Sequence, residues 1–323
     1  MKKKYQISLS LLIFFVFVTP PLLFLIGNKK FSEVKILRIK PQMSSKAIAT
    51  LLQEEKIIRS KNFFLLLLKL TRKERKLQAG LYELRSWTSP FDLIRKLVKG
   101  EVAVIILTIP EGYTAARIAN LLEKKQLCSS EKFLKVVKES ELEGYLFPAR
   151  YTIPSSISIE GIISMMEQKF KEVMFPYEKG LEETFLKDIV IVASIVEKEA
   201  QMNWERPIVA SVLYNRLKKR MFLASCVTVE YALGEHKARL STKDLLIESP
   251  YNTYLNYGLP PGPICSPGRA SLEAALFPAK TNFLFFLSKG DGTNAFSETY
   301  AQHLKSKREL QTLPETIDQK VNR

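Results

Sequence analysis

The segment from Leu186 to Ala200, LKDIVIVASIVEKEA, constrains the fold more than any other part of the chain. It contains no Gly or Pro, and the stretch from Ile191 to Val196 is apolar except for Ser194. This pattern predicts a helix that is apolar on nearly every side, and such a helix lies at the centre of a domain. The other helices and strands must therefore pack around it.

The predicted helix ends in two acidic residues, Glu197 and Glu199, on either side of Lys198. Burial disfavours a charged carboxylate, so a carboxyl group at the end of a buried helix can stay protonated near neutral pH and serve as a general acid. The alternative is that both residues ionise and pair with Lys198 or a nearby Arg. Two positions correspond to about 200° around a helix, so both carboxylates cannot point into one site.

The composition limits the partners and the chemistry. A chain of 323 residues can hold more than one domain and a sizeable core. Its net charge of +16 implies an acidic partner, such as nucleic acid, anionic lipid or an anionic polymer. With two His and three widely spaced Cys, no metal-ligand spacing occurs, and we expect neither a metal nor a cofactor. No nucleic acid is expected as a partner, because helix-turn-helix, RNP and zinc-finger patterns are all missing from the sequence.

The N-terminus predicts a membrane anchor. Three lysines at 2–4 precede an apolar run of about 20 residues, the length that crosses a bilayer core as a helix. We predict an uncleaved anchor at 5–27, with the lipid bilayer as its partner; the alternative is a cleaved signal peptide, which would have a shorter apolar region and a small-residue cleavage site. The lysines favour a cytoplasmic N-terminus in a single-pass plasma-membrane protein, with everything after residue 30 outside the cytoplasm.

A repeat follows this region. The segment 37–57, LRIKPQMSSKAIATLLQEEKI, aligns without gaps with 107–127, LTIPEGYTAARIANLLEKKQL. Both copies predict a strand, a turn and a helix with a Ser or Thr cap. The alternative is that the two segments share only their patterning, because strand-turn-helix arrangements are common.

The C-terminal half contains polar segments that suit a binding site. Pro207–Leu217 predicts a helix on which Asn215 and Arg216 either face the site or bind structural groups. Tyr251–Gly268 is rich in Pro, Gly, Asn and Tyr, and a rigid loop of this kind, with aromatic faces and hydrogen-bonding groups, suits the wall of a binding site; the alternative is an ordinary surface connection. Residues 283–287 predict a buried strand, and a turn after it predicts a hairpin.

Eight short motifs occur in a fixed order along the chain. They are EGYLFPARY at 143–151, ASIVEKEA at 193–200, VLYNRL at 212–217, YNTY at 251–254, GLPPGPI at 258–264, SPG at 266–268, AALFPAK at 274–280 and FSETYAQH at 296–303. Together they resemble the endolytic murein transglycosylase family, also called MltG or YceG-like, and the resemblance covers roughly residues 30–308. Two positions depart from the family pattern: Ala149 stands where Asp is usual, and Cys226-Val227 stands where Asp-Pro is common.

The resemblance implies an enzyme that cleaves peptidoglycan glycan strands internally between MurNAc and GlcNAc. The C6 hydroxyl of MurNAc attacks its own anomeric carbon and leaves a 1,6-anhydro end, so one carboxyl group can first donate and then accept the proton. By match to the family motif, this group is Glu197. The resemblance also raises peptidoglycan synthases as candidate partners. Two alternatives stay open: a non-catalytic, membrane-tethered glycan-binding scaffold, and a muramidase that uses water.

These expectations define a fold class, domain boundaries and a site. The class is α+β, with an N-terminal transmembrane helix, a LysM-like small α+β module and a mixed α+β catalytic domain. The expected regions are a cytoplasmic 1–4, the anchor at 5–27, the LysM-like region at 31–106, the second strand-helix copy at 107–142, the catalytic domain at 143–310 and a polar tail at 311–323. Besides Glu197, the expected substrate-binding residues are Glu143, Asn215, Arg216, Tyr251, Asn252, Tyr254, Pro261 and Ser266. For Glu143, a surface position at a helix end is the alternative.

Overall fold

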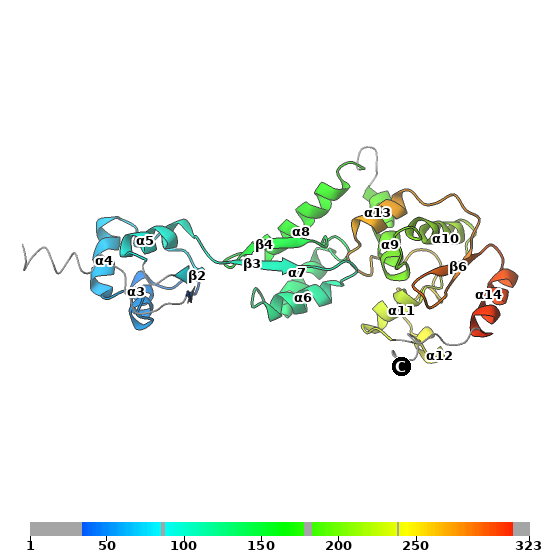
Figure 1. The fold of residues 1–323 in the computed structure, drawn as a ribbon, viewed down its shortest axis with the longest axis horizontal. Helices are drawn as coiled ribbons and strands as arrows, with labels where there is room; N and C mark the ends of the chain where they lie inside the picture. The colour runs from blue at the N-terminus through cyan, green and yellow to red at the C-terminus, as the bar shows by residue number, and fades with distance from the viewer. Residues whose placement is uncertain (1–33, 85–87, 178–182, 238, 313–323) are drawn as a thin grey trace, which may run out of the picture. The chain divides into compact units, whose positions relative to one another are not determined.

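The computed structural model describes residues 34–84, 88–177, 183–237 and 239–312, in a mixed α+β arrangement (Figure 1). The chain divides into two compact units, Met1–Ile106 with Thr152–Ile157, and Leu107–Tyr151 with Ser158–Arg323. The predicted anchor at 5–27 lies outside the described residues. Among those that are described, no helix combines the length and the apolar character needed to cross a membrane.

The first unit contains a β-α-α-β arrangement, called here the first copy. Its elements are β1 (Lys35–Ile39), α3 (Ser45–Glu54), α4 (Lys61–Leu70) and β2 (Gly80–Leu84), followed by α5 (Pro90–Lys99). The two strands pair antiparallel, with Leu37 opposite Tyr82. Alternation along the strands and helical spacing along α3 and α4 direct their apolar side chains into one core, which includes Leu52 and Phe64. Of the apolar residues of α4, Phe64, Leu67 and Leu68 are buried in this core, whereas Leu66 and Leu70 are exposed.

A second β-α-α-β arrangement, called the second copy, follows along the chain with its elements in the same order. Its elements are β3 (Val104–Thr108), α6 (Ala115–Lys124), α7 (Ser130–Glu139) and β4 (Arg150–Pro154). β3 and β4 form a two-stranded sheet, and the division between the units passes through both strands.

The two copies agree in the details of their backbones. Ser44 and Thr114 cap α3 and α6 by accepting the N–H three residues on, each at 3.2 Å. Before each helix the chain turns through a left-handed residue, Gln42 with φ 63° and Gly112 with φ 72°. The strand-turn-helix pattern that the alignment predicts is thus present in both segments.

The second unit is built around α9 (Glu183–Glu199), which begins earlier than the predicted helix at 186–200 and ends one residue before it. Every residue from Ile189 to Val196 is buried, including Ser194. The Ser194 hydroxyl accepts the Ile264 N–H at 3.0 Å, and its carbonyl accepts the Cys265 thiol at 3.3 Å. The one polar residue in the apolar run therefore fastens the 251–268 loop to the central helix.

The remaining elements surround this helix. They are α8 (Ile159–Met174), α10 (Arg206–Lys218), α11 (Cys226–Leu233), α12 (Thr242–Leu245), α13 (Arg269–Leu276), β5 (Phe285–Ser288), β6 (Asn294–Ser297) and α14 (Tyr300–Thr312). Helices α9, α10 and α13 pack against one another, and α11 contacts α9 (Figure 1).

The C-terminal hairpin forms as predicted, with β5 antiparallel to β6. Its turn is fixed by the Asp291 carboxylate, which accepts the Thr293 N–H at 2.9 Å. Strand β5 begins two residues later than the sequence pattern indicated and is only partly buried, because a two-stranded sheet is covered on one face. The fully buried Glu205 accepts both the backbone N–H and the side-chain amide of Asn294, which anchors β6.

Candidate active site

The first acidic residue at the end of α9 is held in a cluster that we call the Glu197 clamp. Arg206 at the start of α10 donates to Glu197 Oε2 at 3.0 Å, and these two side chains are 8% and 7% exposed. The same oxygen accepts the Gly268 N–H at 2.9 Å and the Ser271 hydroxyl at 2.8 Å, both at the start of α13. The ion pair and hydrogen bonds thus join α9 to α10 and α13.

The second acidic residue, Glu199, has a different environment. The hydroxyl of Ser225, the residue before α11, donates to Glu199 Oε1 at 2.6 Å. Burial raises the pKa of Glu199, and the negative charge of Glu230 adds to this effect; the Ser225 hydrogen bond and the charge of Arg216 oppose it. The environment therefore favours the neutral form of Glu199 more than water does, which suits a general acid.

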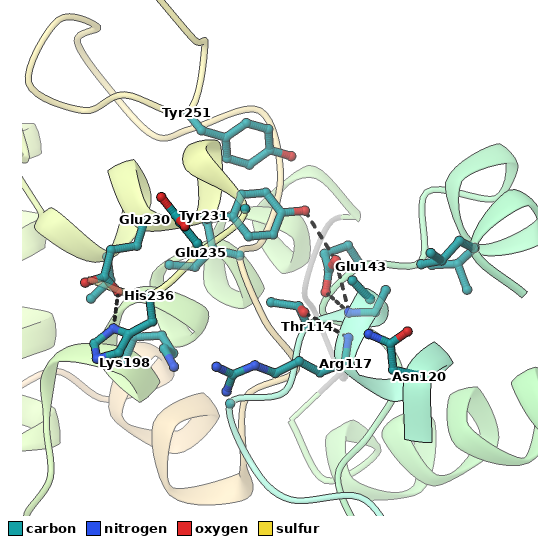
Figure 2. A pocket seen from close by; sticks show the side chains of 18 of the residues that line it. Thr114, Arg117, Asn120, Glu143, Lys198, Glu230, Tyr231, Glu235, His236 and Tyr251 are labelled. Carbon is teal, nitrogen blue, oxygen red and sulfur yellow. Dashed lines mark hydrogen bonds and ion pairs between the residues drawn. The ribbon is translucent and has the colours of Figure 1, made fainter. Parts of the chain in front are cut away.

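A third carboxyl group, Glu143, belongs to a pocket of about 670 Å³ (Figure 2). The pocket is lined by residues of the second copy, of α11 and of the 251–268 loop. Glu143 accepts the Ala115 N–H at 2.9 Å and the Tyr231 hydroxyl at 3.2 Å. Burial raises the pKa of Glu143 to about 7, against the lowering effect of these hydrogen bonds. An enclosed carboxyl beside a pocket differs from the surface residue that was the alternative interpretation.

Two aromatic side chains form one wall of this pocket. The rings of Tyr231 and Tyr251 have their centroids 4.8 Å apart, and Figure 2 shows them next to each other above Glu143. Flat apolar faces with hydroxyl groups at their edges suit contact with a sugar or with small apolar groups.

The comparisons with known proteins agree with the motifs. A family model described as the YceG-like family matches residues 37–309. The chain belongs to the YceG-like family. The resemblance drawn from the sequence is therefore confirmed.

Relatives of this YceG-like protein include curated enzymes and a solved structure. An endolytic murein transglycosylase of Bacillus subtilis (strain 168) is 35% identical over 300 residues, which cover 84% of this chain and 83% of the relative. One from Streptococcus pneumoniae serotype 2 is 33% identical over 256 residues, 66% of this chain and 46% of the relative. A crystal structure of a YceG-like protein from Listeria monocytogenes has a TM-score of 0.58 at 35% identity and covers 85% of this chain and 99% of that one.

Two residues expected to bind substrate are tied to the backbone instead. The Asn215 amide donates to two carbonyls of the segment 281–283, at 2.8 and 3.0 Å. The Arg216 guanidinium donates to the carbonyls of Leu223 and Leu284, both at 2.6 Å. These bonds hold α10 against the β5–β6 hairpin, and Arg216 acts on Glu199 through its charge.

The predicted residues of the 251–268 loop fall into different settings. Asn252 is fully buried and donates to two carbonyls in the segment 245–247, so it organises the loop. Ser266 is also fully buried, and its hydroxyl has no hydrogen-bond partner among the described residues. Pro261 is exposed, and Tyr254 is partly buried. Of the loop positions expected to bind substrate, Tyr251 alone lines the pocket.

Position 226, where the family commonly has Asp, carries an exposed thiol. Cys226 Sγ lies 3.1 Å from the Tyr254 hydroxyl. Although Cys226 is exposed as a residue, its sulfur is partly desolvated by the neighbouring groups, which raises the pKa of the thiol, so it stays protonated near neutral pH. The departure therefore leaves an uncharged group near Glu199. Among the described residues, no cluster of His, Cys, Asp or Glu is placed to hold a metal ion.

Sequence reasoning missed four polar residues of these clusters: Glu111, Arg206, Ser225 and Glu230. Glu111 lies against Gly268, where a Cβ would overlap its carboxylate, and burial followed by the charge of Glu197 raises its pKa. The position of Glu111 in the predicted turn of the second copy could have indicated that this residue lies near the site. Arg206 directly precedes the predicted helix at 207–217, whereas Ser225 directly precedes α11 and Glu230 lies in it, a helix that was not predicted from the sequence; only the fold brings these three residues to α9.

Proposed function

We propose that this chain is an endolytic murein transglycosylase, which cuts peptidoglycan strands between MurNAc and GlcNAc and leaves 1,6-anhydro-MurNAc ends. Its membership of the YceG-like family and the names of its relatives support this function. The observation that carries the proposal is the Glu199 carboxyl. It is enclosed, its pKa is raised, and the helix beside it lines an open pocket.

In this proposal a single carboxyl group performs both proton transfers. Neutral Glu199 gives its proton to the glycosidic oxygen as the bond to C1 of MurNAc breaks. The resulting carboxylate accepts the proton of the C6 hydroxyl as that oxygen bonds to C1, which restores the neutral acid and consumes no water. The Ser225 hydroxyl orients the carboxyl by donating to Oε1. Because the nucleophile belongs to the substrate, its proximity supplies part of the rate enhancement.

We assign the acid/base role to Glu199, although the motif match alone indicated Glu197. Glu197 Oε2 already accepts three hydrogen bonds, one of them from a guanidinium. These bonds occupy that oxygen with groups of the protein itself, and they connect three helices. Glu199 accepts a hydrogen bond from Ser225 at 2.6 Å and has an environment that favours its neutral form.

A muramidase that uses water is the competing function, and one observation favours it. Glu230 lies close enough for its charge to raise the pKa of Glu199, so a second carboxylate is present to activate a water molecule. The products separate the two reactions. An anhydro end indicates intramolecular attack by the C6 hydroxyl, and a reducing end indicates attack by water.

The test compares Glu199→Gln with Glu197→Gln on intact sacculi, with products analysed by mass spectrometry. We expect Glu199→Gln to lower cleavage by about 10²–10⁴-fold with the fold retained, because Gln cannot transfer a proton. Glu197→Gln should mainly reduce the free energy of unfolding, because it leaves Arg206 without its partner. A folded, inactive Glu197→Gln beside an active Glu199→Gln would return the role to Glu197. If the wild-type protein binds glycan strands without cleaving them, the non-catalytic glycan-binding scaffold is the correct function.

The N-terminal part of the proposal concerns location and glycan binding. We propose an anchor at 5–27 with a cytoplasmic N-terminus, which would hold the enzyme beside newly made strands and their synthases. The β-α-α-β order of the first copy supports a LysM-like, glycan-binding role. A reporter fused after residue 40 should be active outside the cytoplasm. Activity only in the cytoplasm would rule out both the location and the substrate.

A further inference from the structure

The pocket beside Glu143 contains cations without a counter-charge. Arg117 of α6, Lys138 of α7 and Lys198 of α9 all line it, and Figure 2 shows Arg117 and Lys198 at its lower rim. None of the three has a carboxylate within ion-pair distance in the part of the chain that the structure describes. Arg117 instead lies 5.8 Å from the centroid of the Tyr113 ring.

The acidic residues of the pocket are, by contrast, already engaged. Glu230 Oε2 lies at hydrogen-bond distance, 2.9 Å, from His236 Nδ1. Glu235 Oε1 forms an ion pair with Lys237 Nζ at 3.2 Å. Glu143 is only partly ionised near neutral pH, because burial raises its pKa to about 7. The groups that remain available for a ligand are therefore mainly cationic, and they favour an anion.

The pocket also has an apolar part. Leu134, Val137, Val227 and Ile264 line it together with the two tyrosines. A bare phosphate or sulfate would leave these side chains without contact. A ligand that fits the whole pocket carries small apolar groups as well as anionic ones.

Helix α11 connects this pocket to the proposed proton donor. Its first turn follows Ser225, which donates to Glu199, and its later residues Val227, Glu230 and Tyr231 line the pocket. Lys198, another lining residue, directly precedes Glu199 on α9. If Glu199 is the proton donor, a part of the substrate that occupies this pocket lies near the glycosidic bond that is cut.

We propose that this pocket binds the peptide stem carried by the muramyl residue, with Arg117, Lys138 and Lys198 holding the stem carboxylates. In peptidoglycan, each MurNAc bears at its lactyl group a short peptide that contains alanine methyl groups and free carboxylates, which match the apolar and cationic parts of the pocket. This inference rests on the proposed function, and it makes the enzyme selective for peptide-bearing strands over bare ones.

The first test measures cleavage of two substrates by the full chain: peptide-bearing strands, and strands from which an amidase has removed the stems. We expect peptide-bearing strands to be cleaved at least about tenfold faster, the factor that one charge-assisted hydrogen bond can supply. Arg117→Ala and Lys138→Ala should each reduce this ratio. Lys132→Ala, an exposed cation on the same helix as Lys138, is the matched control and should keep the wild-type ratio. Equal rates on the two substrates would overturn the inference and leave the lyase function intact.

The second test does not depend on catalysis. Calorimetry with a synthetic stem tetrapeptide should show binding that weakens when its carboxylates are amidated and when Arg117 is replaced by Ala. If no strand is cleaved and the tetrapeptide still binds in this way, the proposed function fails and the pocket assignment stands. Failure of the tetrapeptide to bind, with Arg117-dependent binding of pyrophosphate, would overturn the inference in favour of a phosphate-bearing ligand.

Discussion

The first and second copies show how one backbone serves two purposes. Both have a strand, a capped helix, a second helix and a returning strand, with equivalent left-handed residues. They differ in the turn before the first helix and on the exposed side of that helix. Pro41, Ala47 and Thr50 of the first copy correspond to Glu111, Arg117 and Asn120 of the second at the 70-residue offset of the alignment. Shared buried positions keep the backbone, and exposed positions carry the chemistry.

The largest expected effect comes from removing an equivalent core side chain in each copy. Leu52 and Leu122 are both fully buried, so Leu52→Ala and Leu122→Ala should each lower the free energy of unfolding by about 2–5 kcal/mol. Only Leu122→Ala should also slow strand cleavage when the protein is still folded, because α6 lines the pocket. Urea denaturation measures the change in the free energy of unfolding, and the rate at which cleaved glycan fragments are released measures strand cleavage. Equal loss of cleavage in both variants would remove the functional distinction between the copies.

The second prediction concerns pH and the start of α6. The folded-state pKa of Glu143 is raised to about 7 from an ordinary 4.5, so its contribution to stability is full below pH 4.5 and is lost as pH rises through 7. Across this window the loss is about 3 kcal/mol. In the first copy, the Ser45 hydroxyl and the Glu74 carbonyl hold the start of α3 and do not titrate.

Glu143→Gln should therefore flatten the fall in stability between pH 5 and 8. Urea midpoints of the wild type and the variant at both pH values give the difference; Glu199, whose pKa is raised in both proteins, contributes equally to each. An unchanged pH dependence in the variant would show that Glu143 does not titrate in this range.

The third prediction exchanges the left-handed residues. Gly112→Ala should cost about 1–2 kcal/mol through the backbone alone, because the nearest side-chain atoms to an added Cβ, on Glu197 and Lys198, are 3.6 Å away. Gln42→Gly should be neutral or stabilise by up to about 1 kcal/mol, because Gly adopts φ 63° without strain. Thermal denaturation gives both values. The same sign in both variants would mean that the two turns are not equivalent.

The smallest effect concerns a surface ion pair that only the first copy has. Lys35 and Glu55 lie 3.3 Å apart with side chains 35% and 49% exposed, and the second copy has Ile105 and Lys125 at these positions. Glu55→Gln should lower the free energy of unfolding by about 0.5 kcal/mol at low salt and by less at high salt. A loss that persists at high salt would point to a contribution other than charge.

The sequence predicted the parts of this molecule that depend on local periodicity. The central helix, the repeat, the hairpin and the family were all readable, because apolar spacing and turn residues act over short distances. The site was less accessible. Whether Glu197 or Glu199 is free to transfer a proton depends on Arg206, Ser225 and Ser271, which reach α9 from other helices.

The polar residues of the motifs posed a related difficulty. Asn215, Arg216 and Asn252 were expected at the substrate, and their side chains bind backbone carbonyls of segments distant in sequence or in the neighbouring turn. A motif indicates that a polar side chain has a fixed partner. It does not indicate whether that partner is the substrate or the chain, because the choice is made by tertiary contacts.

The thiol of Cys265, which donates to the Ser194 carbonyl, has a practical consequence. This side chain is fully buried against α9, and burial raises its pKa, so a thiol-alkylating reagent cannot reach it in the native protein. Cys226 is exposed and Cys128 is partly exposed, so both can be blocked first. After that step, modification of Cys265 requires the 251–268 loop to separate from the central helix. The rate at which Cys265 is alkylated therefore reports how often this part of the second unit opens. Mass spectrometry of the intact protein measures that rate without any added label.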